Sequence, residues 1–168
     1  MKIQFKPHQK FLLKRSVLRC GVMAPVIGSA INMLLFRPGR TVAYLGVEVF
    51  FTALITSLIC NLIYCGNFKK EKALNAPEMP YDLKTHILYK YMPSGGVFKQ
   101  SLFLAIVTTV LIAVLPALML IITGMNTEAT LFGWVGCKML TGIVYVSFTT
   151  YHIMAYRITS FQKADRGE

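Results

Sequence analysis

The stretch of sequence that decides the fold covers residues 41–65 and reads TVAYLGVEVFFTALITSLICNLIYC. Within this stretch, Glu48 is the one residue that is charged at neutral pH. The hydrocarbon core of a bilayer is about 30 Å thick, so a helix needs about 20 mainly apolar residues to cross it. Residues 41–65 are therefore predicted to form a membrane-spanning helix.

Three other stretches of similar length and composition cover residues 17–36, 101–123 and 131–155. Each is bounded by charged residues or by a turn signal, such as the Arg-Pro-Gly-Arg sequence at residues 37–40. We therefore predict an all-α integral membrane protein with a single domain, residues 1–168. Its four transmembrane helices form a bundle that is made of two hairpins.

The overall composition supports a membrane protein. Hydrophobic residues make up 55% of the chain and charged residues 15%, whereas about a quarter of the residues in a soluble domain are charged. The apolar content excludes intrinsic disorder. The formal net charge of +11 would suit a nucleic-acid-binding protein, but the apolar stretches leave too little soluble chain for such a domain. Nucleic acid is therefore not an expected partner.

A secretory signal peptide is the alternative interpretation of the N-terminal region. The basic segment ahead of the first apolar stretch extends to Arg19, which is too long for a signal peptide. No cleavage site of small residues follows Phe36. We therefore interpret residues 17–36 as the first span.

The distribution of basic residues predicts the orientation of the chain. Of 18 Lys and Arg residues, 15 precede or open the first span, lie in the middle loop (residues 66–100) or follow the fourth span. Two lie at residues 37–40, and Lys138 lies inside the fourth span. Positively charged loops resist translocation, so both termini and the middle loop are expected to be cytoplasmic. The predicted location is a cell membrane, namely a bacterial inner membrane or a plasma membrane.

The middle loop contains a candidate interfacial helix over residues 80–92. Its apolar side chains recur at helical spacing, at Leu83, Ile87, Leu88 and Tyr91. This pattern predicts a short amphipathic helix on the inner leaflet of the bilayer. The residues expected to contact lipid there are Lys84, Lys90, Tyr89 and Tyr91. An ordinary solvated connection is the alternative interpretation.

Two charged residues lie deep within the predicted spans. Glu48 and Lys138 are each the eighth residue of a span that starts at the outer surface, so both lie about 10 Å below it. An isolated charge at that depth is costly, and such residues usually pair with each other. Ser29 and Asn32 of the first span are expected nearby.

Three interpretations of this polar site remain open. In the first interpretation, the site binds an ion or a small polar ligand, or it relays a proton. In the second, it is a structural ion pair that fixes which helices are neighbours. In the third interpretation, Lys138 extends to the outer surface on its own.

The two hairpins also suggest a weak internal repeat. An offset of 90 residues pairs Tyr44 with Trp134 and Glu48 with Lys138. A duplication would relate the hairpins by an axis along the membrane normal. Chance similarity between apolar helices is the alternative explanation.

Signatures of metal binding and catalysis were sought in the same way. The four cysteines and three histidines do not have the spacing of a zinc or haem site, so neither a metal nor a cofactor is expected. No metalloprotease, thiol-oxidase or phosphate-loop motif occurs. No catalytic residue is therefore predicted, and an enzyme acting on lipid is the least favoured function.

Two functions remain. The first is an accessory, regulatory or immunity-type interaction subunit, whose partners are the lipid bilayer and either another membrane protein or further copies of this chain. The second is a small oligomeric transporter or channel for an ion or a small polar solute, which would use the site at Glu48 and Lys138.

Overall fold

The computed structural model describes residues 5–35, 38–66, 68–94, 96–124 and 127–167. All named secondary-structure elements in these ranges are helical, so the all-α prediction is confirmed. They are α1 (Pro7–Leu12), η1 (Leu13–Val22), α2 (Met23–Leu35), α3 (Val42–Gly66), α4 (Lys70–Leu74), η2 (Tyr89–Tyr91), α5 (Val97–Thr108), η3 (Thr109–Ala113), α6 (Val114–Thr123) and α7 (Leu131–Arg166).

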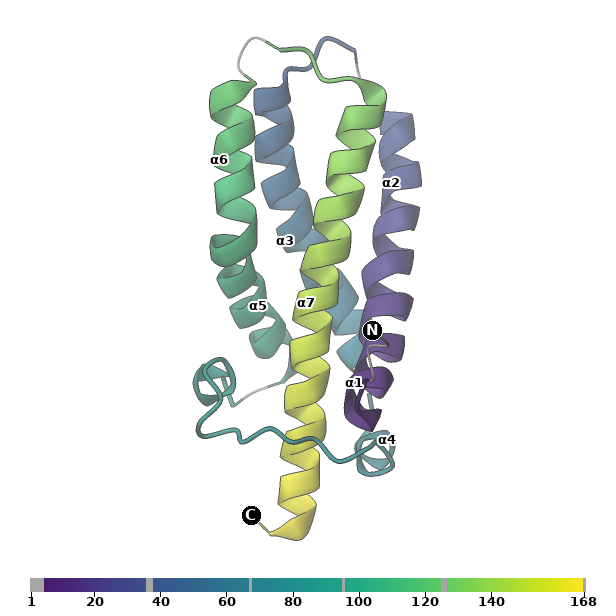
Figure 1. Ribbon diagram of the computed structural model, residues 1–168, viewed down its shortest axis with the longest axis vertical. Coiled ribbons are helices and arrows are strands. Elements are labelled where there is room, and N and C mark those ends of the chain that lie inside the picture. Colours follow the sequence, from purple (N-terminus) through teal and green to yellow (C-terminus); the bar gives the residue numbers. More distant parts are fainter. Residues whose placement is uncertain (1–4, 36–37, 67, 95, 125–126, 168) are drawn as a thin grey trace.

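These elements form long helical rods that lie side by side (Figure 1). The first rod consists of α1, η1 and α2, the second is α3, the third consists of α5, η3 and α6, and the fourth is α7. Helix α7 packs against α3 and against η1 and α2, while α3 also packs against α5 and α6. At the upper end in Figure 1, short connections join α2 to α3 and α6 to α7. The C-terminus and the connection between α3 and α5 lie at the lower end.

The rods follow the apolar stretches, with three extensions. The first rod begins at Pro7 rather than at residue 17, the third rod begins at Val97 rather than at residue 101, and α7 continues past residue 155 to Arg166. Gly167 ends α7 in the left-handed conformation, which glycine adopts without steric cost. Because α7 extends beyond its apolar stretch, it offers the rest of the lower end a helix surface to pack against.

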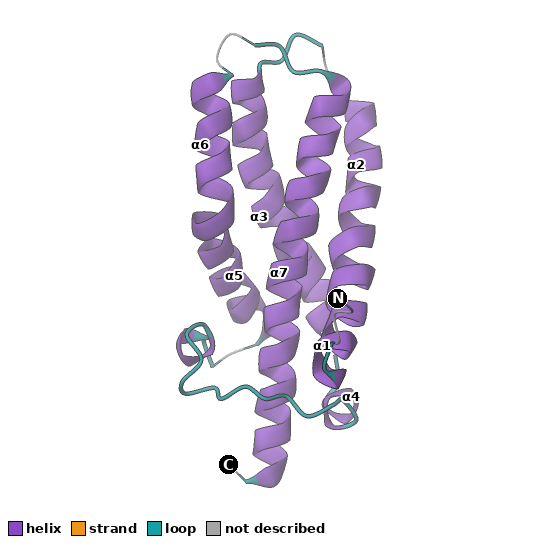
Figure 2. Ribbon diagram, viewed as in Figure 1, coloured by secondary structure: helices purple, strands orange, loops and turns teal. Residues whose placement is uncertain are grey.

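Proline changes the hydrogen-bond pattern inside two of the rods without ending them. The π-helical segments η1 and η3 each end three residues before a proline, Pro25 and Pro116 respectively. Proline has no N–H to donate to the carbonyl four residues earlier. Local π-type turns allow a helix to satisfy such carbonyls again. Both rods therefore continue to their upper ends as helices (Figure 2).

Two helices in the described part of the chain, α3 and α7, are long and apolar enough to cross a membrane. Only 24% of the most apolar stretch of α3 and 28% of that of α7 are buried. The core helix of a soluble protein would be mostly buried. Instead, Phe51, Ile55 and Ile59 are each more than half exposed at successive turns of α3. This exposed apolar surface favours a membrane location.

The predicted interfacial helix over residues 80–92 is wrong. The segment forms separate turns, followed by the single 3₁₀ turn η2. One cause is Asp82, whose carboxylate accepts hydrogen bonds from Lys84 N (3.1 Å) and Thr85 Oγ1 (3.1 Å). Such local bonds between a side chain and the backbone compete with helix formation.

The expected position of Tyr89 among lipid headgroups is also wrong, because this residue is only 2% exposed. It belongs to the largest apolar core, at the lower end, together with Leu12, Phe68, Leu104 and Ile158. This core joins residues from α1, α5, α7 and the middle connection (residues 67–96). The extended α7 offers the tyrosine ring a protein surface to pack against. Lys84, Lys90 and Tyr91 remain exposed, and their contact with lipid stays a prediction.

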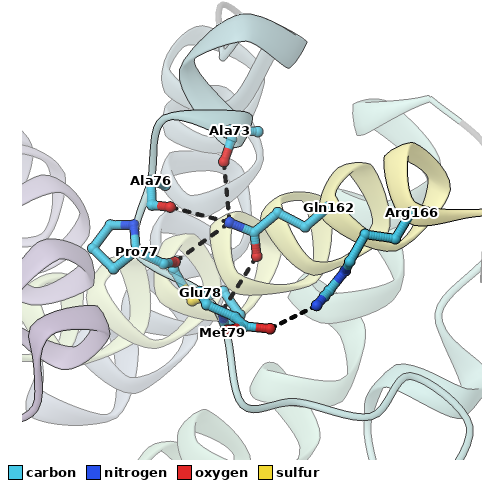
Figure 3. Close-up of polar contacts among 7 residues, drawn as sticks. All are labelled: Ala73, Ala76, Pro77, Glu78, Met79, Gln162 and Arg166. Carbon is cyan, nitrogen blue, oxygen red and sulfur yellow. Dashed lines mark hydrogen bonds and ion pairs between the residues drawn. The ribbon is translucent and has the colours of Figure 1, made fainter.

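Gln162 holds the middle connection against α7 (Figure 3). Its Nε2 donates hydrogen bonds to the carbonyl oxygens of Ala73 (3.3 Å), Ala76 (3.1 Å) and Pro77 (3.4 Å), and its Oε1 accepts one from Met79 N (3.2 Å). One side chain thus contacts backbone groups from the end of α4 (Lys70–Leu74) into the non-helical segment that follows, where carbonyls lack regular helical partners.

Candidate functional site

Glu48 lies between two cations near the upper end. Its Oε2 is 2.7 Å from Lys138 Nζ, and its Oε1 is 2.6 Å from a terminal nitrogen of Arg40. Glu48 belongs to α3 and Lys138 to α7, while Arg40 precedes α3. The contact between Glu48 and Lys138 that equal depth predicts is present. The sequence analysis did not predict the participation of Arg40.

Backbone hydrogen bonds between the two upper connections hold Arg40 in place. Val42 N donates to the carbonyl of Thr127 (2.8 Å), and Ala129 N donates to the carbonyl of Arg40 (2.8 Å). Arg40 therefore lies at the start of α3, about two helical turns from Glu48, within reach of an extended arginine side chain. A basic residue followed eight positions later by an acidic residue at a helix start is the sequence signal that could have revealed this pair.

Aromatic rings lie beside both cations. The guanidinium carbon of Arg40 is 4.7 Å from the ring centroids of Tyr44 and Trp134, and Lys138 Nζ is 5.0 Å from that of Trp134. These are cation–π distances. We refer to Arg40, Tyr44, Glu48, Trp134 and Lys138 as the upper ion cluster. The cluster contains two cations and one carboxylate. The Lys138 side chain is 6% exposed and the Glu48 side chain is 20% exposed.

A cavity of about 40 Å³ lies next to the upper ion cluster, between α2, α3 and α7. The polar residues that line it are Ser29, Thr52, Thr56, Lys138 and Thr141. A cavity of this size has room for water or a small inorganic ion but not for an organic solute.

The remaining predicted site residues belong to the first rod. Ser29 and Lys138 line the same cavity. Asn32 lies in α2, but its side chain falls outside the described residues.

A second polar network connects α3 and α7 farther down. Ser57 Oγ donates to Thr149 Oγ1 (2.9 Å), Thr150 Oγ1 donates to Asn61 Oδ1 (3.0 Å), and Asn61 Nδ2 donates to Ser57 Oγ (3.2 Å). All four residues are fully buried. Sequence analysis missed this network. The signal was the pair Ser57 and Asn61, which are four residues apart and so share one face of α3.

The middle connection joins α7 through two tyrosine hydroxyls. Tyr89 Oη lies 3.1 Å from Nδ1 of His152, and Tyr81 Oη lies 2.9 Å from Tyr151 Oη. The ring of His86 stacks on that of Tyr89, with centroids 3.8 Å apart. Burial raises the pKa of the Tyr89 hydroxyl above its usual value, so the group stays protonated at neutral pH.

Neither a metal site nor a related protein indicates the function of this chain. Among the described residues, no group of three His, Cys, Asp or Glu side chains could hold a metal ion. The chain matches no protein-family model, no curated protein and no solved structure. Function therefore has to be inferred from the contacts within this chain.

Proposed function

We propose that the chain is a four-span membrane protein with cytoplasmic termini that acts as an accessory or regulatory interaction subunit. Each of the four rods has at least 25 residues, enough to cross a bilayer, and the two short connections share one end (Figure 1). Among the described residues, the segments that carry 14 of the 16 Lys and Arg residues belong to the opposite end. The positive-inside rule assigns that end to the cytoplasm. Arg40, an exception to the rule, forms an ion pair with Glu48.

The observation that carries the functional proposal is the closed geometry of the upper ion cluster. Both carboxylate oxygens of Glu48 have a cation within 2.7 Å, and the adjacent cavity measures about 40 Å³. A transport site has to exchange these partners for a solute, at the cost of leaving buried charges unpaired. The arrangement instead supports a structural role, in which the cluster fixes α3, α7 and the upper connections relative to each other.

The lower end supports a role in binding a partner. There, the middle connection is fixed to α7 by Gln162 and by the core around Tyr89. Exposed basic residues cover this ordered surface, namely Lys14, Lys69, Lys72, Lys84, Lys90 and Lys99. The exposed acidic residues Glu71, Glu78, Asp82 and Asp165 lie at the same end, but the basic residues outnumber them. A surface with a net positive charge favours association with a partner of opposite charge. The partner is therefore expected to be a membrane protein with an acidic cytoplasmic face, because two copies of this basic end repel each other.

Site-specific photo-crosslinking in intact membranes tests this proposal. A photoreactive residue at Lys72 or Lys90, both exposed at the lower end, should give a discrete adduct with an acidic membrane protein. The same residue at Phe132, which is 81% exposed near the upper end, serves as the control and should react only with lipid.

Proteoliposomes test the competing transport function. The purified chain should not increase the flux of protons, alkali cations or halides above that of empty vesicles. Flux that disappears in Glu48→Gln, while the variant remains folded, would contradict the proposal and assign transport to the upper ion cluster.

A further inference from the structure

A pocket of about 170 Å³ lies between α5 and α7 near the lower end, away from the upper ion cluster. The residues that line it are Gln100, Tyr156, Arg157, Ser160 and Phe161. Four of these five side chains carry a hydrogen-bond donor, and none is acidic. The composition of the pocket therefore favours an anionic ligand.

Arg157 is the charged residue in the lining of this pocket. Its Nε is buried and has no hydrogen-bond partner among the described residues. No ion pair found among those residues includes Arg157, whereas Arg40 and Arg166 each lie 2.6 Å from a glutamate oxygen. The Arg157 guanidinium carbon lies 5.4 Å from the ring centroid of Phe161, which restricts the orientation of the group.

A buried donor without an acceptor is costly, and a bound anion removes that cost. The planar guanidinium group matches the spacing of two oxygens on a phosphate or carboxylate. Ser160 and Tyr156 supply neutral donors that can bind the remaining oxygens. We propose that this pocket binds a phosphate group.

The position of the pocket favours a phospholipid headgroup as the source of that phosphate. Along α5, the exposed apolar residues Leu102 and Ile106 lie above it, and the exposed Lys99 lies near the start of the helix. In the membrane orientation proposed above, on which this part of the inference rests, the pocket lies at the depth of the inner headgroups. Free phosphate has the same chemistry and is the alternative source.

Binding to the full-length chain in detergent tests the site. The probes are short-chain phosphatidylglycerol, short-chain phosphatidylcholine and inorganic phosphate, with affinity measured by native mass spectrometry and by thermal shift. Phosphatidylglycerol should bind most tightly. Arg157→Gln should weaken its binding at least about tenfold, because a charge-assisted hydrogen bond is lost. Arg157→Lys should have an intermediate effect, since it keeps the charge but loses the paired donors.

A matched control separates this site from general charge attraction. Arg15 also stacks on a phenylalanine, with its guanidinium carbon 5.3 Å from the Phe11 centroid, but it does not line the pocket. Arg15→Gln should therefore keep the wild-type affinity. Without ligand, Arg157→Gln should unfold at the wild-type temperature or higher, because it removes a donor that has no acceptor. Equal losses of affinity in the two variants would overturn the proposal.

A second variant tests the site without removing the arginine. Ser160→Asp places a carboxylate three residues from Arg157 on the same helix, where the two side chains can pair. The variant should fold and lose its response to all three probes. Wild-type binding by this variant would also refute the site.

The probes also distinguish the two sources of phosphate. Binding of phosphatidylglycerol that depends on Arg157 and is not displaced by inorganic phosphate supports the lipid headgroup. Displacement by inorganic phosphate supports the free anion. If cysteine labelling contradicts the membrane orientation while Arg157-dependent phosphate binding persists, the phosphate site stands and only the lipid source fails.

Discussion

The two ends of the bundle are stabilised in different ways. At the upper end, one carboxylate and two cations connect α3, α7 and the upper connections through charge pairing and cation–π contacts. At the lower end, a large apolar core and the hydrogen bonds of Gln162 connect α7 to the middle connection. The ion pairs of the lower end lie on exposed side chains, such as that between Arg166 and Glu78.

In the proposed membrane orientation, the difference follows from the surroundings of each end. Within an apolar environment, packing of apolar side chains distinguishes poorly between correct and incorrect helix neighbours, whereas an unpaired charge is costly. Where the chain extends beyond that environment, apolar burial again favours one arrangement and ion pairs contribute little. Substitutions of similar chemistry should therefore have unequal effects at the two ends.

The largest effect is expected from breaking the upper ion cluster. Glu48→Gln leaves Lys138 and Arg40 without their carboxylate and should lower the free energy of unfolding by about 3–5 kcal/mol. Lys138→Met should also destabilise the chain, and the double variant should recover part of the loss, because only Arg40 then remains unpaired. Glu128→Gln, at an exposed position of the same end, is the control. Denaturation in detergent measures all four variants, and a double variant no more stable than Glu48→Gln would contradict pairing.

Close helix packing should produce the next largest effect. A Cβ at Gly46 would lie 2.8 Å from the carbonyl oxygen of Ala117, so Gly46→Ala forces α3 away from α6 and should cost about 1–3 kcal/mol. Gly136, which the weak repeat pairs with Gly46, has no atom within 4 Å of the equivalent Cβ position. Gly136→Ala is therefore expected to be neutral or slightly stabilising. Equal destabilisation by both substitutions would show that helix contact does not explain the choice of glycine.

At the lower end, Gln162→Ala should have a smaller and more local effect. The loss of hydrogen bonds to the carbonyls of Ala73 and Ala76 should cost about 1 kcal/mol and speed amide exchange in residues 70–80. Gln162→Glu keeps the acceptor for Met79 N but turns the donor into a carboxylate oxygen that faces the carbonyl oxygens of Ala73 and Ala76, so it should accelerate exchange at least as much as alanine does. Accelerated exchange throughout α3 would show that Gln162 stabilises the whole bundle rather than this segment.

The sequence predicts the upper end better than the lower end. Apolar stretches set the positions of the helices, and equal depth of Glu48 and Lys138 was sufficient to predict their contact. Arg40 escaped prediction because its partner depends on how the two upper connections bind each other.

The lower end was predicted less well because helical spacing does not distinguish a lipid surface from a protein surface. Tyr89 fits either surface, and its ring lies beside His152 and Tyr156 of α7, a helix that continues past residue 155. That continuation has no apolar stretch to reveal it. The role of Gln162 likewise depends on the path of the middle connection, which no local pattern specifies.

The smallest effect is expected at Asp82, on the exposed surface of the middle connection. Hydrogen bonds from the backbone of Lys84 and from the side chains of Lys163 and Thr85 lower the pKa of its carboxyl group. A lowered pKa in the folded state means that Asp82 contributes stability above its ordinary pKa, and that this contribution is lost as the pH falls through the lowered value. Protection of the amides of residues 82–86, measured as the exchange rate relative to that of an unstructured peptide at the same pH, should fall in that window. Asp82→Asn should remove the pH-dependent step and exchange faster at neutral pH, because it cannot pair with Lys163. A step that persists in Asp82→Asn would assign the titration to another group.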